Sequence, residues 1–74
     1  MTQNEMILAH MKRHGSISPK EASENYGVMR LGARIYDLKK EGHRIMTRNE
    51  KSVNRFGDPI HYARYLYVGE KEVN

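Results

Sequence analysis

Apolar residues recur at helical spacing in three successive stretches of the chain. In the first stretch, Ile7, Leu8 and Met11 fall on one face of a helix. The residues TQNE at 2–5 match a capping box, in which a Thr hydroxyl and a Glu carboxylate satisfy free backbone N–H groups at a helix start. We therefore expect a helix over about residues 3–14.

A short connector and a second helix follow. Residues 16–17 are too short for anything but an extended link that buries Ile17. The residues SPKE at 18–21 form a stronger capping box, because Pro is also favoured at the first helical position. This helix is expected over about 19–25, and Gly27 can end it in a left-handed conformation.

The third stretch carries the clearest apolar stripe. Val28, Leu31, Ile35 and Leu38 repeat at intervals of three and four residues, and Gly42 is placed to end the helix. Two helices joined by a short turn around a glycine are typical of a helix-turn-helix unit. We expect the second and third helices to form such a unit.

Beyond the third helix the period changes to two. Residues 45–49 alternate, and residues 60–68 are rich in β-branched and aromatic side chains. Between them, the residues NRFGDP at 54–59 have the composition of a turn. The pattern predicts a β-hairpin with a long, polar tip.

The alternation leaves open which side of the second strand is buried. Two inward sets fit equally well: Tyr62 with Leu66, or Ala63 with Tyr65 and Tyr67. After the strand, residues 69–74 are mostly polar, and we expect them to form a flexible tail. The folded domain is therefore predicted to span residues 1–68.

Composition narrows the class of protein. A chain of 74 residues has room for one small core, and without cysteine that core must be held by packing alone. No apolar run approaches the length of a signal peptide or a membrane span, so we expect a soluble, cytoplasmic protein with no membrane partner. The net charge of +4 permits nucleic-acid binding without proving it.

The order of elements defines an expected α+β architecture, three helices followed by a hairpin, over residues 4–68. This is the layout of the winged helix-turn-helix fold. The residues GVMRLGARIYDLKKEGH at 27–43, and those from NRFG at 54–57 through HYARY at 61–65, resemble a family of small helix-turn-helix proteins common in bacteriophage and prophage genomes. That resemblance implies a DNA-binding role in regulation or as a recombination accessory factor.

The third helix carries the first group of candidate DNA-binding residues. The side opposite its apolar stripe is expected to present Arg30, Ala33, Tyr36, Asp37 and Lys40, with Arg34 at its flank. Arg30 and Arg34 suit guanine edges or phosphates. Alternatively, Arg34 pairs with Asp37 or Glu41 along the helix. Gly32 lowers helix stability, which suggests a close approach to another helix or to DNA.

The hairpin carries the second group. Its basic side chains are opposed by two acidic ones and suit phosphates or the minor groove: Arg48, Lys51, Arg55, His61 and Arg64. The exposed Phe56 also favours contact. The alternative is that these charges prevent edge-to-edge strand pairing. At the start of the second helix, Ser18 and Lys20 are further candidates for phosphate contact, although capping alone explains Ser18.

Metal binding and catalysis are not expected. His10 and His14 have the spacing of a two-histidine metal site, but the neighbouring Lys12 and Arg13 repel cations. The spacings contain no catalytic triad, no phosphate-binding glycine loop and no buried carboxylate pair. We therefore expect a protein that is not an enzyme, with no cofactor and no small-molecule substrate.

The leading hypothesis is sequence-specific binding of double-stranded DNA by the third helix and the wing, in a phage or prophage transcriptional regulator or recombination accessory factor. It requires the guanidinium groups of that helix and of the hairpin loop to project to one side. The alternative hypothesis is a protein-binding winged helix, a phage-encoded inhibitor of a host nucleic-acid enzyme. A third is binding of RNA or single strands. Because one small module reads few base pairs, a homodimer is also possible.

Overall fold

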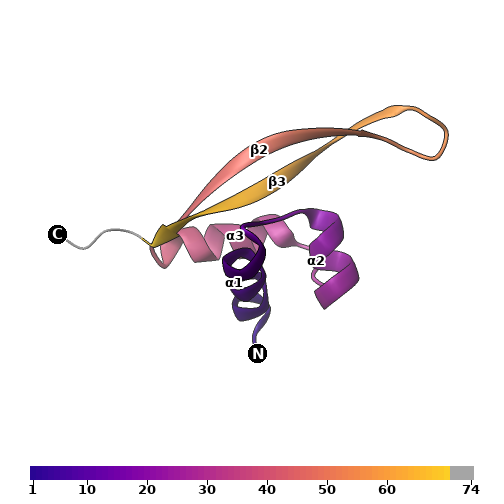
Figure 1. Cartoon of the computed structure of the whole chain (residues 1–74). Helices are drawn as coiled ribbons and strands as arrows, with labels where there is room; N and C mark the ends of the chain where they lie inside the picture. The colour runs from indigo at the N-terminus through magenta and orange to yellow at the C-terminus, as the bar shows by residue number, and fades with distance from the viewer. Residues whose placement is uncertain (71–74) are drawn as a thin grey trace.

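The computed structural model describes residues 1–70, and its elements follow the expected order (Figure 1). Three helices precede a hairpin, and a two-residue strand lies between the first two helices. The elements are α1 (Gln3–His14), β1 (Ser16–Ile17), α2 (Pro19–Tyr26), α3 (Leu31–Lys40), β2 (His43–Val53) and β3 (Pro59–Glu70). The predicted α+β class is confirmed.

The first two helices begin where their capping boxes predict, and α1 also ends at the predicted residue. The Thr2 hydroxyl accepts a hydrogen bond from the Glu5 backbone N–H (3.1 Å), and the Glu5 carboxylate accepts one from the Thr2 N–H (2.9 Å). Ser18 and Glu21 form the same reciprocal pair at the start of α2. At the end of α2, Gly27 has φ of 67°, the left-handed conformation expected. α2 runs one residue longer than predicted.

The third helix begins later than its apolar stripe indicates. Val28 is buried, but it lies in the turn before α3, and the helix itself starts at Leu31. Arg30 is the N-cap residue, with a non-helical backbone and no side-chain cap. The stripe misplaces the start because a buried turn residue and a buried helical residue look alike in the hydrophobic pattern.

The sheet has three antiparallel strands in the order β1-β3-β2. The expected connector is itself a strand, in which Ile17 pairs with Tyr65. β3 continues through Glu70, so the prediction that a tail starts at 69 is wrong for the first two residues of that segment. Backbone pairing with β2 extends the strand there, as His43 opposes Glu70. Residues 71–74 of the expected tail lie outside the described residues.

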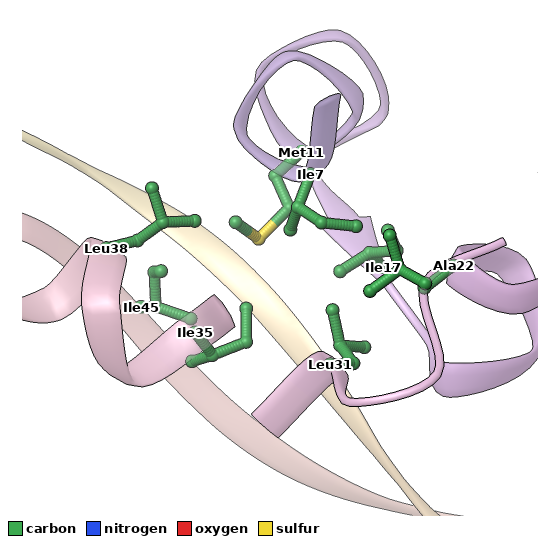
Figure 2. Packing of buried hydrophobic residues seen from close by; sticks show 9 residues of the cluster. Ile7, Met11, Ile17, Ala22, Leu31, Ile35, Leu38 and Ile45 are labelled. Carbon is green, nitrogen blue, oxygen red and sulfur yellow. The ribbon is translucent and has the colours of Figure 1, made fainter. Parts of the chain in front are cut away.

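The core lies between the helices and one face of the sheet (Figure 2). Its side chains come from every helix, from β1 and β2, and from the turn before α3: Ile7, Met11, Ile17, Ala22, Val28, Leu31, Ile35, Leu38 and Ile45. Tyr65 and Tyr67 pack against this cluster from β3. They decide the alternative that the sequence left open: the inward set is Ala63, Tyr65 and Tyr67.

The hairpin extends well beyond the helices (Figure 1). The molecule is elongated, with extents of 50 × 25 × 20 Å, and the tip of the hairpin lies past α2 at one end. Within residues 1–70, no helix combines the length and apolarity needed to cross a membrane. The fold thus places a long two-stranded arm beside a small helical body.

Truncating Ile17 should unfold a large fraction of the protein. The side chain is 0% exposed, and replacing a buried Ile by Ala typically costs about 2–5 kcal/mol through lost burial and a residual cavity. We expect Ile17→Ala to lower the urea midpoint by a corresponding amount. Val53→Ala is the control, because that side chain is 64% exposed and should change stability by less than about 0.5 kcal/mol. Equal effects of the two variants would contradict the described core.

Candidate nucleic-acid interface

The outer side of α3 presents a small, an aromatic and a cationic residue. Leu31 and Ile35 face the core, whereas Ala33, Tyr36 and Lys40 lie on the opposite side and are exposed. The Tyr36 side chain is 63% exposed, and the Lys40 ammonium lies 5.5 Å from the centre of its ring. This side of the helix is therefore open to solvent and carries positive charge at its C-terminal end.

Arg34 and Asp37 do not belong to that side. They pair with each other at 3.3 Å and lie against the start of α1, where Arg34 donates to the Gln3 side-chain carbonyl (3.4 Å). The Asn4 side-chain amide donates to Asp37 (3.4 Å). The expected outward position of Asp37 is wrong because α1 packs on this flank of α3. For Arg34, the arrangement matches the ion-pair alternative.

The first turn of α3 is exposed to solvent. Arg30 is exposed just before the helix, and Gly32 is exposed within it. A Cβ at Gly32 would meet the Tyr65 hydroxyl at 3.8 Å, an ordinary contact distance. Within the protein, Gly32 therefore makes no close approach to α1 or α2, and its nearest neighbour is Tyr65 of β3 at an ordinary distance. This contact also sets α3 beside the inward face of the hairpin.

That inward face continues along the hairpin as a polar surface. Lys51 pairs in register with His61, two positions beyond Asn49 and Ala63 and four beyond Thr47 and Tyr65. Because side chains alternate along a strand, these residues share the face that packs on α3. The Asn49 amide and the His61 ring lie within hydrogen-bond distance (3.4 Å).

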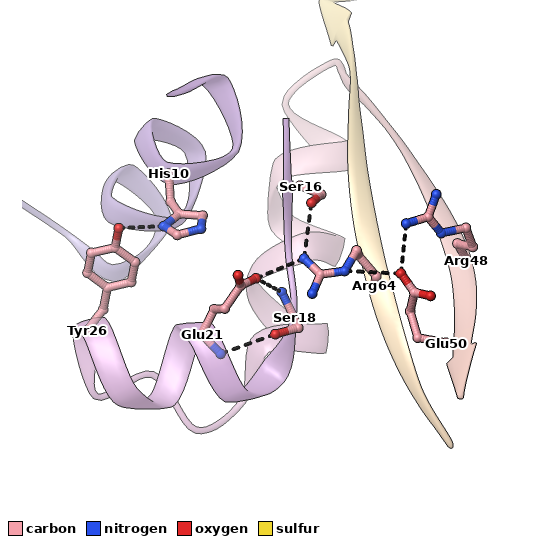
Figure 3. A network of polar contacts seen from close by, with 8 residues as sticks. All are labelled: His10, Ser16, Ser18, Glu21, Tyr26, Arg48, Glu50 and Arg64. Carbon is pink, nitrogen blue, oxygen red and sulfur yellow. Dashed lines mark hydrogen bonds and ion pairs between the residues drawn. The ribbon is translucent and has the colours of Figure 1, made fainter. Parts of the chain in front are cut away.

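Arg64 lies on the other face and is held on three sides (Figure 3). One terminal nitrogen donates to Glu21 of α2 (2.9 Å) and to the Ser16 hydroxyl (3.1 Å), while Nε pairs with Glu50 of β2 (3.2 Å). Arg48 donates to the same Glu50 carboxylate (2.7 Å). Arg64 therefore joins β3 to α2 and β2, and the free position expected for it is wrong. Arg48 pairs within its own strand and stays exposed, but it lies on the face of the hairpin opposite to Lys51.

The carboxylates of this network are held in their charged form. Partial burial alone would raise the pKa of Glu21, but the Ser18 backbone N–H and the Arg64 guanidinium hold it below its ordinary value. The pKa of Glu50 is lowered mainly by the hydrogen bond from Arg48 and further by Arg64. The charge of this network is therefore largely internally compensated at neutral pH.

The two candidates at the start of α2 differ in access. Ser18 is 3% exposed, and its hydroxyl caps the helix, so the phosphate contact expected for it is blocked. Lys20 is exposed and lies 4.0 Å from Glu24 one turn later, a weak surface pair. Ser18 is both a helix cap and a buried residue because it directly follows Ile17, the buried residue of β1.

Of the guanidinium groups expected to share one side, Arg34 is turned toward α1, whereas Arg30 and Arg55 are exposed. Arg48 and Arg64 lie on the face of the hairpin opposite to Lys51. The exposed residues of α3, its first turn, the inward hairpin face and the tip make up a different set, which we call the groove-facing set: Arg30, Ala33, Tyr36, Lys39, Lys40, Asn49, Lys51, Arg55 and His61. The sequence prediction missed Lys39 and Asn49. The alternation of β2 could have identified Asn49, since it places Asn49 beside Lys51.

The histidine pair of α1 is also partly structural. The His10 ring is buried, and its Nδ1 lies 2.7 Å from the Tyr26 hydroxyl, which links α1 to α2. Burial, followed by the nearby His14, lowers the pKa of His10. Within the part of the chain that the structure describes, no three His, Cys, Asp or Glu side chains are grouped so that they could hold a metal ion.

Comparison with known proteins assigns the family. The winged helix-turn-helix domain matches residues 2–69, nearly the whole chain, and the protein belongs to this family. The predicted winged helix-turn-helix fold is confirmed. Domains of this family are typically non-enzymatic and bind DNA, so the family indicates DNA binding. The search of curated proteins found no match, nor did the search of solved structures.

Removing the Arg64 side chain should loosen the attachment of the hairpin to α2. It deletes charged hydrogen bonds to Glu21 and Glu50, and the loss of the partly exposed Glu21 pair alone should lower stability by up to about 1 kcal/mol at neutral pH. Arg48→Ala, on a more exposed side chain, is the control and should cost less.

The Arg64→Ala effect should also depend on pH. Both glutamates have a pKa below the ordinary value of 4.5 in the folded protein. Their stabilisation of the fold is therefore complete above pH 4.5, and it is lost as the pH falls below 4.5 and through the pKa that each glutamate has in the folded protein. The difference in urea midpoint between wild type and Arg64→Ala should therefore be largest at pH 7 and become smaller below pH 4.5. A difference that stays constant down to pH 3 would contradict the ion-pair role.

Gly32→Ala should leave the fold intact and raise its stability. The new methyl group meets no close contact. Near the start of a helix, replacing Gly by Ala should raise the stability of the helix by at most about 1 kcal/mol. Gly27→Ala is the opposing control, because its φ of 67° is strained for any residue with a Cβ. Thermal unfolding should show an upward shift for the first variant and a downward shift for the second. If both variants were less stable than wild type, the space beside the Tyr65 hydroxyl would be too small for a methyl group at position 32.

Proposed function

We propose that this protein recognises specific sequences in double-stranded DNA, with α3 in the major groove and the hairpin on the adjacent backbone and minor groove. One observation carries the proposal. Ion pairs within the protein hold Arg34, Arg48 and Arg64, yet the cations of the groove-facing set stay exposed on α3, the inward hairpin face and the tip. Exposed cations of this kind supply most of the affinity for a polyanion.

In this arrangement the outer side of α3 reads the bases. Ala33 and Gly32 allow the helix backbone to approach closely, and the Tyr36 ring with Lys40 beside it offers an apolar surface next to a charge. Arg30 lies at the leading end of the helix, the part that enters the groove most deeply in helix-turn-helix proteins. Arg30 is our candidate for bidentate recognition of guanine.

The hairpin provides backbone contacts. Lys51 and His61 lie opposite each other on the inward face, and Arg55 lies at the tip. Contacts of this type set the position of a protein on the duplex without reading sequence. The residues that fix the hairpin to the body, above all Arg64, act as positioning residues because they hold this charged face beside α3.

The proposed biological role follows from the resemblance to small phage and prophage proteins. We propose a transcriptional regulator or an accessory factor in recombination. A single module of this size typically covers about 600–1,000 Å² on DNA, so two copies on neighbouring half-sites would be needed for high specificity. A homodimer or paired occupancy of one site meets that need.

The affinity for duplex DNA should fall steeply with salt. Fluorescence anisotropy with labelled duplexes should give a log–log slope that corresponds to about four to seven neutralised phosphates. Lys51→Gln and Arg55→Gln should each reduce that slope by about one and weaken binding to all duplexes alike. Arg13→Gln is the matched control, because this exposed cation lies in the last turn of α1, outside the groove-facing set.

Two outcomes would contradict the proposal. One is the absence of duplex binding even at low salt. The other is a loss of slope in Arg13→Gln equal to that in Lys51→Gln, since it would show that net charge, and not this surface, determines binding. Competition with single-stranded DNA of the same sequence distinguishes duplex recognition from stacking on single strands.

A further inference from the structure

The hairpin tip holds one large apolar side chain out into solvent. Phe56 is 90% exposed, the highest exposure among the large hydrophobic residues described. Phe56 belongs to the loop between β2 and β3. That loop lies at the far end of the arm, away from the helices (Figure 1). Packing within the chain therefore gives no reason for a phenylalanine at this position.

The tip is held in a defined shape. The Asn54 side-chain carbonyl accepts hydrogen bonds from the backbone N–H groups of Phe56 (2.9 Å) and Asp58 (3.0 Å). The Asn54 N–H donates to the Asp58 carbonyl (2.9 Å), and Gly57 adopts φ of 81° to close the turn. These bonds fix the backbone that carries Phe56, so less conformational entropy is lost when it binds.

The arm has the length needed to reach the next groove. Tyr65 contacts the position of Gly32 on α3 and pairs with Thr47 of β2. From Thr47 to Asn54 the strand extends roughly 23 Å, at about 3.3 Å per residue. A major-groove site and the adjacent minor groove are separated by roughly 17 Å, half of a ~34 Å helical turn. With α3 in the major groove, the tip can reach the neighbouring minor groove.

The surroundings of Phe56 suit DNA. Arg55 precedes Phe56 at the tip, and Lys51 lies on the face of the hairpin that continues from α3, so two cations and the single carboxylate of Asp58 surround the position of the ring along the chain. Apolar side chains flanked by cations are used by minor-groove proteins to enter between two base pairs and kink the helix. A ring carried by a hydrogen-bonded turn at the end of an extended arm meets the steric requirement for this insertion.

We propose that Phe56 is an intercalating wedge, which enters the minor groove beside the segment bound by α3, unstacks one base step and bends the duplex. The inference rests on the proposed DNA-binding function and adds a site to it. Pyrimidine–purine steps such as TpA unstack most readily. The wedge therefore gives the protein a preference for sites with a flexible step at the distance reached by the tip, a preference that needs no hydrogen bond to a base.

The test compares duplexes of about 25 base pairs that differ in one central step, TpA or GpC. In the TpA duplex, 2-aminopurine replaces the adenine of that step, and both duplexes carry a dye pair at the two ends. Wild-type protein should brighten the 2-aminopurine, raise energy transfer between the ends and bind the TpA duplex several-fold more tightly. Phe56→Ala should bind the TpA duplex roughly tenfold more weakly, with neither optical change and with no preference between steps.

Two further variants keep the test specific. Phe56→Trp should retain the optical changes, because it preserves a flat ring. Met46→Ala truncates another exposed apolar residue, 62% exposed on the face of β2 opposite to Lys51, and should behave like wild type. Circular dichroism should show unchanged folding for all of them, since none removes a core contact.

The possible failures can be told apart. If wild-type protein binds both duplexes but the 2-aminopurine stays dark and the ends do not approach, the wedge is overturned and DNA binding stands. If Phe56→Ala keeps the wild-type bend and preference, the wedge is likewise overturned. If wild-type protein binds no duplex at low salt, the proposed function fails and the wedge fails with it.

Discussion

The rest of the structure depends on how the hairpin is attached to the three helices. The attachment is small. β1 supplies two residues that pair with β3, Ile17 inserts into the core from that strand, and the Tyr67 N–H donates to the Gly15 carbonyl (2.9 Å). Arg64 adds a polar link from β3 to α2 and β2. Because a two-stranded ribbon alone is marginally stable in water, these contacts decide its direction.

This attachment explains how the charged residues are divided between two tasks. Arg64 and Arg34 lie partly buried at junctions, where each holds two or more elements together through a fixed set of acceptors. The planar guanidinium group suits this use because it can donate in several directions at once. The exposed cations of the groove-facing set lie on α3 and the hairpin, away from those junctions. A modest net charge can thus provide both a stable fold and a cationic surface.

The arm adds reach at a low structural cost. Its far half makes no contribution to the core, and its shape is maintained by backbone pairing and by the Asn54 turn. In the proposed complex with DNA, the helical body covers one groove and the arm extends the contact to the next. Changes in the far half can therefore alter recognition while leaving the stability of the body nearly unchanged.

The sequence by itself determined the features that depend on neighbours along the chain. The capping boxes at Thr2 and Ser18, the glycine after α2 and the alternation of β2 are local, so they predict the elements and their order. The third helix was misplaced at its start because Val28 is buried without being helical. The class of fold and the identity of α3 as the helix with an exposed outer side were thus available from the sequence.

Only the tertiary structure decided the partners of the charged residues and the buried side of β3. Arg64 meets Glu21 across 43 positions of sequence, and Arg34 meets Gln3 across 31. No periodicity along the chain encodes such encounters, because they depend on how α1 and α2 pack against α3 and the sheet. The same packing turned Tyr65 and Tyr67 inward and left Lys51 and His61 on the face that continues from α3. The composition of the candidate interface is therefore a property of the assembled fold.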